Sequence, residues 1–228
     1  MHAKIATTIA PGVETQSAQT GADVNSPQYW SERYRTGNTQ WDLGSETPAF
    51  VALVERLDFP KPSEHFRPRV LVPGCGYGHD ALMMAQRGYA VTAVDFAPEP
   101  IAYLQRTAHI AGVEIETVCD DVFDLPEQFD NAFDIVLEYT CYCAIAPSRR
   151  AEYAGVIARV LKPNGLLAGL FFPLDDIVRT EPPFTVREDE VRNNFEHAGL
   201  VLLSSEIPLE SHPARAGRER LMIFRKLL

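Results

Sequence analysis

Apolar and polar positions follow two alternating patterns from residue 69 to the end of the chain. Short apolar runs of the kind that β-strands give are separated by longer stretches in which apolar residues recur every three or four positions, as on one face of an α-helix. Glycines stand where several of these helical stretches end, and glycine is a common helix terminator. The pattern predicts strands at 69–73, 90–94, 114–118, 133–138, 166–172, 200–207 and 220–227, and helices at 80–87, 99–111, 147–161 and 185–198.

Strands that alternate with helices usually pair in parallel, because each parallel pair needs a crossover connection. Only a loop at 210–217 separates the last two predicted strands, so these two should pair antiparallel. We therefore expect an α/β fold with a doubly wound, mostly parallel sheet of seven strands, helices on both faces and an antiparallel C-terminal hairpin. Arg215 and Arg218 fall in what we interpret as a polar hairpin loop. Thr185 and Glu188 have the spacing of a capping box, which predicts that the last helix opens there.

The most specific motif is the turn after the first predicted strand, where Gly74, Gly76 and Gly78 form a G-x-G-x-G sequence. Glycines lack a Cβ, so the backbone can pass close to a ligand there. The next strand ends at Asp95, where nucleoside-binding α/β folds place the acid that accepts the ribose hydroxyls. The motif predicts a site for an adenosine-containing cofactor. The alternatives are a glycine turn that only tightens the strand–helix junction, and an Asp95 that only caps a helix.

The spacing of the glycines distinguishes between cofactors. The dinucleotide fingerprint is G-x-G-x-x-G, whereas here the glycines alternate and position 79 is His. Asp80 stands in the first turn of the following helix, where a carboxylate would repel a pyrophosphate. Both features favour S-adenosylmethionine over NAD or FAD.

Composition narrows the possible partners. The chain has 228 residues, enough for one α/β domain, which we place at 27–228. Its formal net charge of −10 and the lack of a basic stripe argue against a nucleic-acid substrate. The sequence has no apolar run of the length that crosses a membrane. We expect a monomer that acts on a small molecule.

The first 26 residues differ in composition from the rest of the chain. Residues 1–26 are rich in Ala, Thr, Gln, Ser and Gly, without the charged start and apolar core of a secretory signal. We interpret them as a flexible N-terminal arm and expect the protein in the cytoplasm. Cys141 and Cys143 lack the C-x-x-C spacing of zinc or redox sites, so the cysteines are interpreted as buried thiols and no metal is expected.

Several segments together resemble one enzyme family. The sequences YWSERY at 29–34 and TQWDLG at 39–44 look like the N-terminal helix and lid of the thiopurine S-methyltransferase superfamily. VPGCGYGHD at 72–80 fits its glycine loop, with proline where other methyltransferases have an acid. FDIVLEY at 133–139, followed by CAI at 143–145, is similar to the halide and thiol methyltransferases within that superfamily. The resemblance covers about residues 27–228 and implies a Rossmann-like class I methyltransferase fold.

The resemblance also implies a set of site residues. It places three aromatic residues of segment 27–44 over the methionine end of S-adenosylmethionine, glycines beneath that end, an acid at the ribose, two residues at the adenine and a tyrosine beside the transferring methyl. In the same order, these are Trp30, Tyr34 and Trp41, then Gly74 and Gly76, then Asp95, then Asp121 and Val122, and finally Tyr139. The family usually has a second tryptophan at the position of Tyr34. A tyrosine is smaller, so the acceptor pocket could be wider or more polar.

Physical arguments support the roles of the aromatic residues, but each of these residues and Tyr139 also has a structural interpretation. A sulfonium cation is attracted to aromatic faces by about 0.5–2 kcal/mol per contact, and Trp30 and Tyr34 share one helical face. The alternative for the aromatic residues is a place in the core. Glu138 ends a buried strand, where an unpaired carboxylate is costly, so we expect it to pair with a helix N-terminus or a loop. Tyr139 is either the catalytic residue that holds the acceptor or a packed tyrosine.

The predicted activity is methyl transfer from S-adenosylmethionine to a small soft nucleophile, namely a thiol, hydrosulfide, thiocyanate or halide, by in-line displacement. No histidine or lysine stands beside the expected site as a base, which suits an acceptor that is already an anion. One alternative is an aromatic, thiopurine or natural-product thiol as acceptor. Another is a protein that binds S-adenosylmethionine without catalysis.

Overall fold

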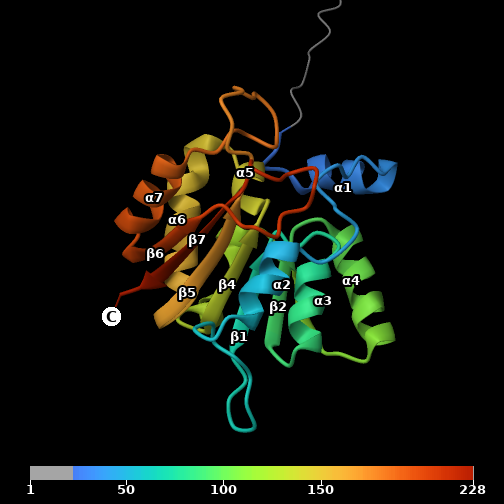
Figure 1. Cartoon of the computed structure of the whole chain (residues 1–228). Helices are drawn as coiled ribbons and strands as arrows, with labels where there is room; N and C mark the ends of the chain where they lie inside the picture. The colour runs from blue at the N-terminus through green and yellow to red at the C-terminus, as the bar shows by residue number, and fades with distance from the viewer. Residues whose placement is uncertain (1–22, 228) are drawn as a thin grey trace, which may run out of the picture.

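Seven strands form a single sheet in the order β3-β2-β1-β4-β5-β7-β6 (Figure 1). The computed structural model describes residues 23–227, so most of the arm expected at 1–26 lies outside the described residues. Strands β1 to β5 pair in parallel, and β7 is antiparallel to both β5 and β6, which confirms the predicted fold. The strands are β1 Arg69–Pro73, β2 Ala90–Asp95, β3 Ile115–Cys119, β4 Phe133–Tyr139, β5 Leu161–Phe171, β6 Leu200–Glu206 and β7 Arg220–Lys226.

Helices cover both faces of the sheet, as expected (Figure 1). Helices α2, α3 and α4 pack on one face, through residues such as Phe50, Met84 and Leu104. Helices α6 and α7 pack on the other, through Tyr153 and Phe195. The helices are α1 Pro27–Thr36, α2 Pro48–Glu55, α3 His79–Gln86, α4 Pro98–Ala111, α5 Cys141–Ala144, α6 Arg150–Val160 and α7 Glu188–His197, with single 3₁₀ turns at η1 Val122–Asp124, η2 Glu127–Phe129 and η3 Pro147–Arg149.

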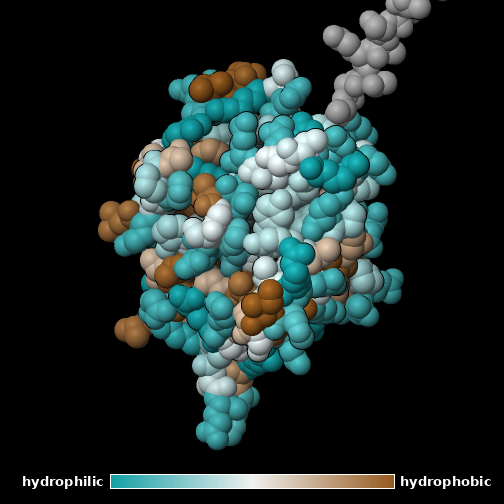
Figure 2. All heavy atoms as spheres, turned by 90° about the vertical axis from the view of Figure 1, so that its right-hand side faces the viewer, coloured by the Kyte–Doolittle hydropathy of each residue, from teal (hydrophilic) through white to brown (hydrophobic). Residues whose placement is uncertain are grey.

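Helix α4 illustrates how the apolar pattern sets the packing. Ile101, Leu104 and Ala108 recur at helical spacing and are buried, while the other side of the helix carries polar residues together with the exposed Ile110. Gly112 ends the helix in the left-handed conformation, at φ 68°. Figure 2 shows this side of the molecule, which is mostly hydrophilic with scattered apolar spots. Within residues 23–227, no helix is both long and apolar enough to cross a membrane.

The start of the last helix differs from the prediction. Helix α7 begins at Glu188 with Arg187 at the N-cap position, and no side chain caps it. The capping box expected at Thr185 is therefore wrong. The Thr185 hydroxyl instead donates to the carbonyl oxygen of Ile177, which closes the loop before the helix. A hydroxyl with a tertiary partner no longer serves the local motif.

Helix α2, which the apolar pattern did not reveal, is fixed by Asp80 at the start of α3. The two oxygens of the Asp80 carboxylate accept hydrogen bonds from the backbone N–H and the hydroxyl of Thr47, at 2.7 and 2.8 Å. Thr47 is the residue before α2. The acid interpreted as unfavourable to a pyrophosphate thus also joins the first turns of two helices.

Glu138 lies beneath the short helix α5 and is 1% exposed. One carboxylate oxygen accepts the backbone N–H of Tyr142 at 2.9 Å, and the other accepts the hydroxyl of Tyr153. It therefore pairs with a helix N-terminus, which was one of the two expected arrangements. Burial raises its pKa to about 7, and these hydrogen bonds oppose the shift.

We expect Gly78→Ala to destabilise the fold more than Gly112→Ala does. Both glycines have positive φ, so both variants carry the backbone strain of an L-residue there, about 1–2 kcal/mol. A Cβ at Gly78 would also lie 2.5 Å from a methyl carbon of the buried Leu104, whereas nothing lies within 4 Å at Gly112. Urea denaturation should show a further loss of about 1–3 kcal/mol for Gly78→Ala. Equal losses would show that Leu104 moves aside freely.

The raised pKa of Glu138 predicts how stability changes with pH. The folded state binds the Glu138 proton more tightly than the unfolded state does, so stability from this group is complete below about pH 4.5 and is lost as pH rises through about 7. Glu138→Gln should flatten the fall in unfolding free energy between pH 5 and 7. Some slope should remain, because burial also raises the pKa of Asp95, to about 6. Parallel curves for parent and variant would contradict the shift.

Candidate active site

A cavity of about 550 Å³ opens at the carboxyl edge of the parallel strands. Three segments outside the sheet complete its wall, and we name them here. The lid is residues 27–44, the strap is residues 173–187 after β5, and the C-terminal segment is residues 207–219 before β7. Figure 1 shows the strap in orange above α5 and the C-terminal segment in red, crossing towards the lid.

The glycine loop lies at the floor of the cavity. A Cβ at Gly74 would lie 2.9 Å from the Cβ and Sγ of Cys141, so the loop and α5 pack as closely as their atoms allow. Gly76, at φ 54°, lies beneath the hydroxyl of Tyr34, which would make an ordinary contact of 3.4 Å with a Cβ, so the positive φ rather than space favours glycine here. The loop therefore offers bare backbone to a ligand, as the sequence motif predicts.

Asp95 ends β2, lines the cavity and is 8% exposed. Its two carboxylate oxygens accept the backbone N–H groups of Gly76 and Ala97, each at 3.0 Å. The side chain thus connects the glycine loop to the start of α4. Each carboxylate oxygen keeps a lone pair for a further donor such as a ribose hydroxyl.

Two more acids follow β3 on the same side of the cavity. Asp120, Asp121 and Val122 all line it. Asp121 accepts the backbone N–H of Phe123 at 3.0 Å, and Asp120 accepts the N–H of Asp121 at 2.9 Å. The residues expected at the ribose and at the adenine therefore lie together in the structure.

The three aromatic residues of the lid also meet. The rings of Trp30 and Tyr34 both pack edge-on against Trp41, with centroid distances of 5.4 and 5.5 Å. All three line the cavity. The indole N–H of Trp30 donates to the carbonyl oxygen of Val24 at 2.8 Å, which fixes the ring. The group is an aromatic wall of the cavity rather than part of either hydrophobic core cluster.

Two polar contacts hold the lid over the site. His79, next to the glycine loop, lies 3.0 Å from a carboxylate oxygen of Asp42 in the lid. Arg215 of the C-terminal segment donates to the carbonyl oxygen of Trp41 at 2.5 Å. The lid is therefore connected both to the floor of the cavity and to the opposite wall.

Tyr139 lies next to the main cavity but does not line it, whereas Thr140 and Cys141 do. It lines a second hollow of about 70 Å³, and four residues belong to the walls of both spaces: Trp41, Leu43, Gly74 and Thr140. Its hydroxyl donates to Glu219. The single hydroxyl hydrogen is thus directed to a carboxylate, and the expected contact with the acceptor stays a prediction.

Sequence analysis missed Arg215 as a site residue. Arg215 is 4% exposed and lines the cavity, so its segment is not simply a polar loop. Its guanidinium lies 4.8 Å from the ring centroid of Tyr139 and 4.7 Å from that of Phe172. Its Nη1 has no hydrogen-bond partner within the described part of the chain. In the sequence, Arg215 belongs to a cluster of arginines in a loop. The spacing of these arginines matches no known motif, so it does not indicate a site.

Strand order places two pairs of charged residues at different ends of the sheet edge. The acids Asp95 and Asp121 follow β2 and β3, at one end of the sheet edge. Gly74 follows β1 in the middle, and Arg215 and Arg218 precede β7 at the other end. Carboxylates accept hydrogen bonds from a nucleoside, and guanidinium groups bind anions. One end is therefore suited to the hydroxyl and amino donors of adenosine, and the other to an anion.

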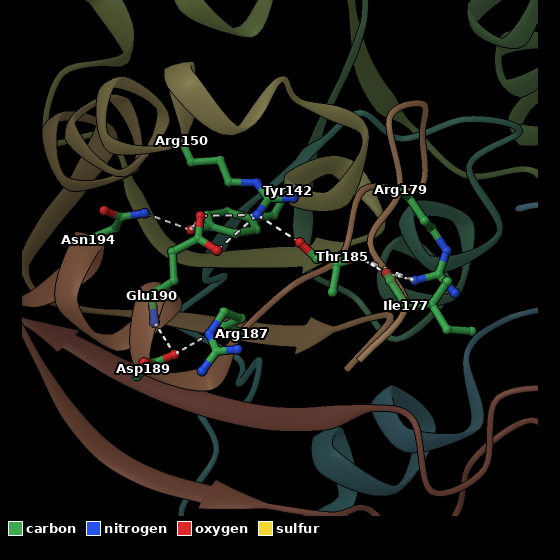
Figure 3. Close-up of polar contacts among 9 residues, drawn as sticks. All are labelled: Tyr142, Arg150, Ile177, Arg179, Thr185, Arg187, Asp189, Glu190 and Asn194. Atoms are coloured by element: carbon green, nitrogen blue, oxygen red, sulfur yellow. Dashed lines mark hydrogen bonds and ion pairs between the residues drawn. The ribbon is translucent and has the colours of Figure 1, made fainter. Parts of the chain in front are cut away.

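A buried ion pair positions the strap (Figure 3). Arg150, 1% exposed, donates from one nitrogen to both oxygens of Glu190 and to the carbonyl oxygen of Thr185, all at 3.0 Å. Its guanidinium lies 4.8 Å from the ring centroid of Tyr142 in α5. In Figure 3, the Thr185 end of the strap points towards this group. Helices α5, α6 and α7 thus hold the strap in place. Glu181, Pro182 and Pro183 of the strap line the cavity.

No group of three or more His, Cys, Asp or Glu side chains suited to a metal ion occurs among residues 23–227. All four cysteines are free thiols, and Cys141 and Cys143 are buried. Burial raises the pKa of both thiols, so neither is an activated thiolate.

Comparison with solved structures identifies the fold. One match is a protein whose structure was solved in work on the conversion of a disulfide bond into a thioacetal group during echinomycin biosynthesis. The TM-score is 0.71 and the identity 23%, over 88% of this chain and 93% of that one. It matches the 1,6-didemethyltoxoflavin-N1-methyltransferase of Burkholderia thailandensis with a TM-score of 0.70 and 23% identity, over 89% and 87% of the two chains. That enzyme was crystallised with S-adenosylhomocysteine bound.

Comparison of sequences identifies the family. The chain is 31% identical to thiocyanate methyltransferase 1 of Arabidopsis thaliana over 200 residues, which are 87% of this chain and 84% of the relative. It is 28% identical to thiopurine S-methyltransferase of Bordetella petrii over 207 residues, 84% of this chain and 91% of that one. The model of the thiopurine S-methyltransferase family matches residues 25–218. The chain therefore belongs to the thiopurine S-methyltransferase family and is an S-adenosylmethionine-dependent methyltransferase.

Proposed function

We propose that this enzyme transfers the methyl group of S-adenosylmethionine to a small soft nucleophile: a thiol, hydrosulfide, thiocyanate or halide. The observation that carries the proposal is Arg215, a buried guanidinium in the cavity wall whose Nη1 has no hydrogen-bond partner among residues 23–227. A buried cation with a free donor is stabilised by an anion. The similarity to thiocyanate methyltransferase 1 supports an anionic acceptor.

The cavity is lined by groups that suit the cofactor. Asp95 would accept the ribose hydroxyls, with Asp121 and Val122 at the adenine. Gly74 and Gly76 leave space where a Cβ would meet Cys141 or approach Tyr34, as close backbone contact with the methionine end requires. The two carboxylate oxygens of Asp95 each accept one backbone N–H group and keep free lone pairs for the ligand.

The aromatic wall of the lid would face the sulfonium. Trp30, Tyr34 and Trp41 form this wall, and rings of this kind attract a cation. When bound, S-adenosylmethionine supplies a methyl carbon that a nucleophile can attack. Covering it with the lid excludes water, and an excluded anion is a better nucleophile than a hydrated one.

The chain's own contribution to the reaction is mainly positioning. Arg215 would hold an anionic acceptor at the end of the cavity opposite Asp121, with Gly74 and Thr140 between them. An anion needs no base, and holding it in line accounts for much of the rate enhancement in such reactions. Thr140 adopts φ 63°, a left-handed conformation that is uncommon for a β-branched residue. Such strain is often retained at functional sites.

A larger aromatic thiol is a second candidate acceptor. Phe172, Pro182 and Pro183 form an apolar part of the cavity wall near the arginines. A flat ring would pack there, and the relative from Bordetella petrii is a thiopurine S-methyltransferase. Relative kcat/KM values for iodide, thiocyanate, hydrosulfide and an aryl thiol separate the two candidates. Calorimetric binding of S-adenosylmethionine without turnover of any of them would show that the acceptor belongs to neither class.

Asp95→Ala should weaken S-adenosylmethionine binding by about 2–3 kcal/mol, because charge-assisted hydrogen bonds to a buried ribose are lost. Asp124→Ala is the matched control, since Asp124 is an exposed acid near the site that does not line the cavity. Isothermal titration calorimetry gives both affinities. An affinity for Asp95→Ala equal to that of the control would remove Asp95 from the cofactor site. NAD should not raise the melting temperature of the parent, whereas S-adenosylhomocysteine should.

Arg215→Gln should raise the KM for thiocyanate or iodide by roughly 10- to 100-fold, the equivalent of a charge-assisted hydrogen bond of about 1.5–3 kcal/mol. The Kd of S-adenosylmethionine should change much less, because Arg215 lies at the other end of the cavity. Arg220→Gln serves as control, since Arg220 pairs with Glu188 at 2.9 Å and does not line the cavity. Similar KM values for the two variants would contradict the role of Arg215.

A further inference from the structure

A neutral thiol acceptor carries a proton that an anion does not. The thiolate is the nucleophile, and an ordinary thiol has a pKa of about 8.5, so it is mostly protonated at neutral pH. Among the described residues, no histidine or lysine lines the main cavity, and His79 in the adjoining hollow is directed to Asp42 at 3.0 Å. The structure, however, places the buried carboxylate of Glu219 directly against the hydroxyl of Tyr139.

Glu219 is held in an unusual environment for a carboxylate. It is 2% exposed, one oxygen accepts the Tyr139 hydroxyl, and the other has no hydrogen-bond partner among the described residues. Burying a carboxylate oxygen without a hydrogen-bond partner costs free energy of folding. A group of this kind therefore calls for an explanation, such as a role in catalysis. The guanidinium of Arg215, four residues earlier, lies 4.8 Å from the centroid of the Tyr139 ring.

Tyr139 itself is not a base in the resting enzyme. Burial raises its pKa well above the usual range, Arg215 lowers it and Glu219 raises it. The phenol is therefore neutral at physiological pH. Because its hydrogen is directed to Glu219, the lone pairs of its oxygen remain available to accept a proton from another donor.

The position of Tyr139 suits contact with an acceptor. The 70 Å³ hollow that Tyr139 lines shares Trp41, Gly74 and Thr140 with the wall of the main cavity. The shared wall lies at the glycine loop and the end of β4, which is the middle of the sheet edge. An acceptor sulfur at this junction would lie between the cofactor end and the Tyr139 side chain.

We propose that Tyr139 and Glu219 form a proton relay that allows the enzyme to methylate thiols in their protonated form, an inference that rests on the proposed function. The thiol proton passes to the Tyr139 oxygen while the Tyr139 proton passes to Glu219. The acceptor sulfur forms its bond to the methyl carbon, and the bond from that carbon to the sulfonium sulfur breaks, with its electron pair remaining on the cofactor product. Glu219 then releases the proton to solvent. Each turnover thus yields a thioether, S-adenosylhomocysteine and one proton.

The charged neighbours of Glu219 leave it available for this role. Arg218 and Arg220, on either side of it in the sequence, are each engaged in an ion pair with another carboxylate. Arg215 donates to the Trp41 carbonyl oxygen and keeps one unpartnered nitrogen. Tyr139 is the only group among the described residues that donates a hydrogen bond to the Glu219 side chain.

The test compares two aryl thiols of equal size, one kept ionised at pH 7 by an electron-withdrawing substituent and one protonated at that pH. Glu219→Gln should lower the ratio of kcat/KM for the protonated thiol to that for the ionised thiol at least tenfold relative to the parent. The ratio should recover as the pH is raised above the pKa of the protonated thiol. Glu219→Asp, which keeps a carboxylate, should restore part of the ratio, and Tyr139→Phe should lower it as Glu219→Gln does.

Several results would overturn the relay. An unchanged ratio in Glu219→Gln, or an equal fall for both thiols, would show that Glu219 only supports the local structure. A parent enzyme that methylates the ionised thiol but not the protonated one would exclude the relay while leaving the proposed function intact. A parent that methylates neither thiol nor iodide would contradict the proposed function itself. The thermal shift with S-adenosylhomocysteine shows whether each variant folds and binds the cofactor product.

Discussion

The site depends on the close packing of the turn after β1 against its neighbours. Gly74 lies against Cys141 on one side and Gly78 against Leu104 on the other, at distances that leave no room for a Cβ. The Gly76 N–H between them is held by Asp95. This turn therefore fixes where α5, α4 and the end of β2 meet, and the cavity forms above it. The lid and the C-terminal segment are positioned relative to the same turn through His79 and Tyr139.

The two ends of the cavity follow from chain topology rather than from any single residue. Parallel strands bring the residues after β2 and β3 to one end of the edge, and the reversal of β7 brings the segment before it to the other. Asp95 and Asp121 thereby lie on one side of the glycine loop, and Arg215 and Arg218 lie on the other. A sulfonium cation and an anionic acceptor can then approach each other between groups of opposite charge.

The sequence predicted those features that depend on local patterns. The strands, the glycine loop and Asp95 are each encoded by residues close together in the chain, so periodicity and spacing revealed them. The aromatic lid was implied by the family resemblance of segment 27–44. Glu219 and Arg215 could not be found in this way, because their partners Tyr139 and Trp41 are distant in sequence. Thr185 shows the opposite error, since a local motif lost its hydroxyl to a contact within the strap.

The contact between Arg215 and the Trp41 carbonyl oxygen has a consequence for the order of events in turnover. In the proposed function the lid covers the cofactor end, and one of its own backbone groups holds the arginine that would bind the acceptor. Opening the lid to exchange the cofactor product therefore also releases the guanidinium from its anchor. An acceptor bound before the lid closes would meet an incompletely assembled anion site. The enzyme should follow an ordered kinetic scheme in which the cofactor binds first and its product leaves last.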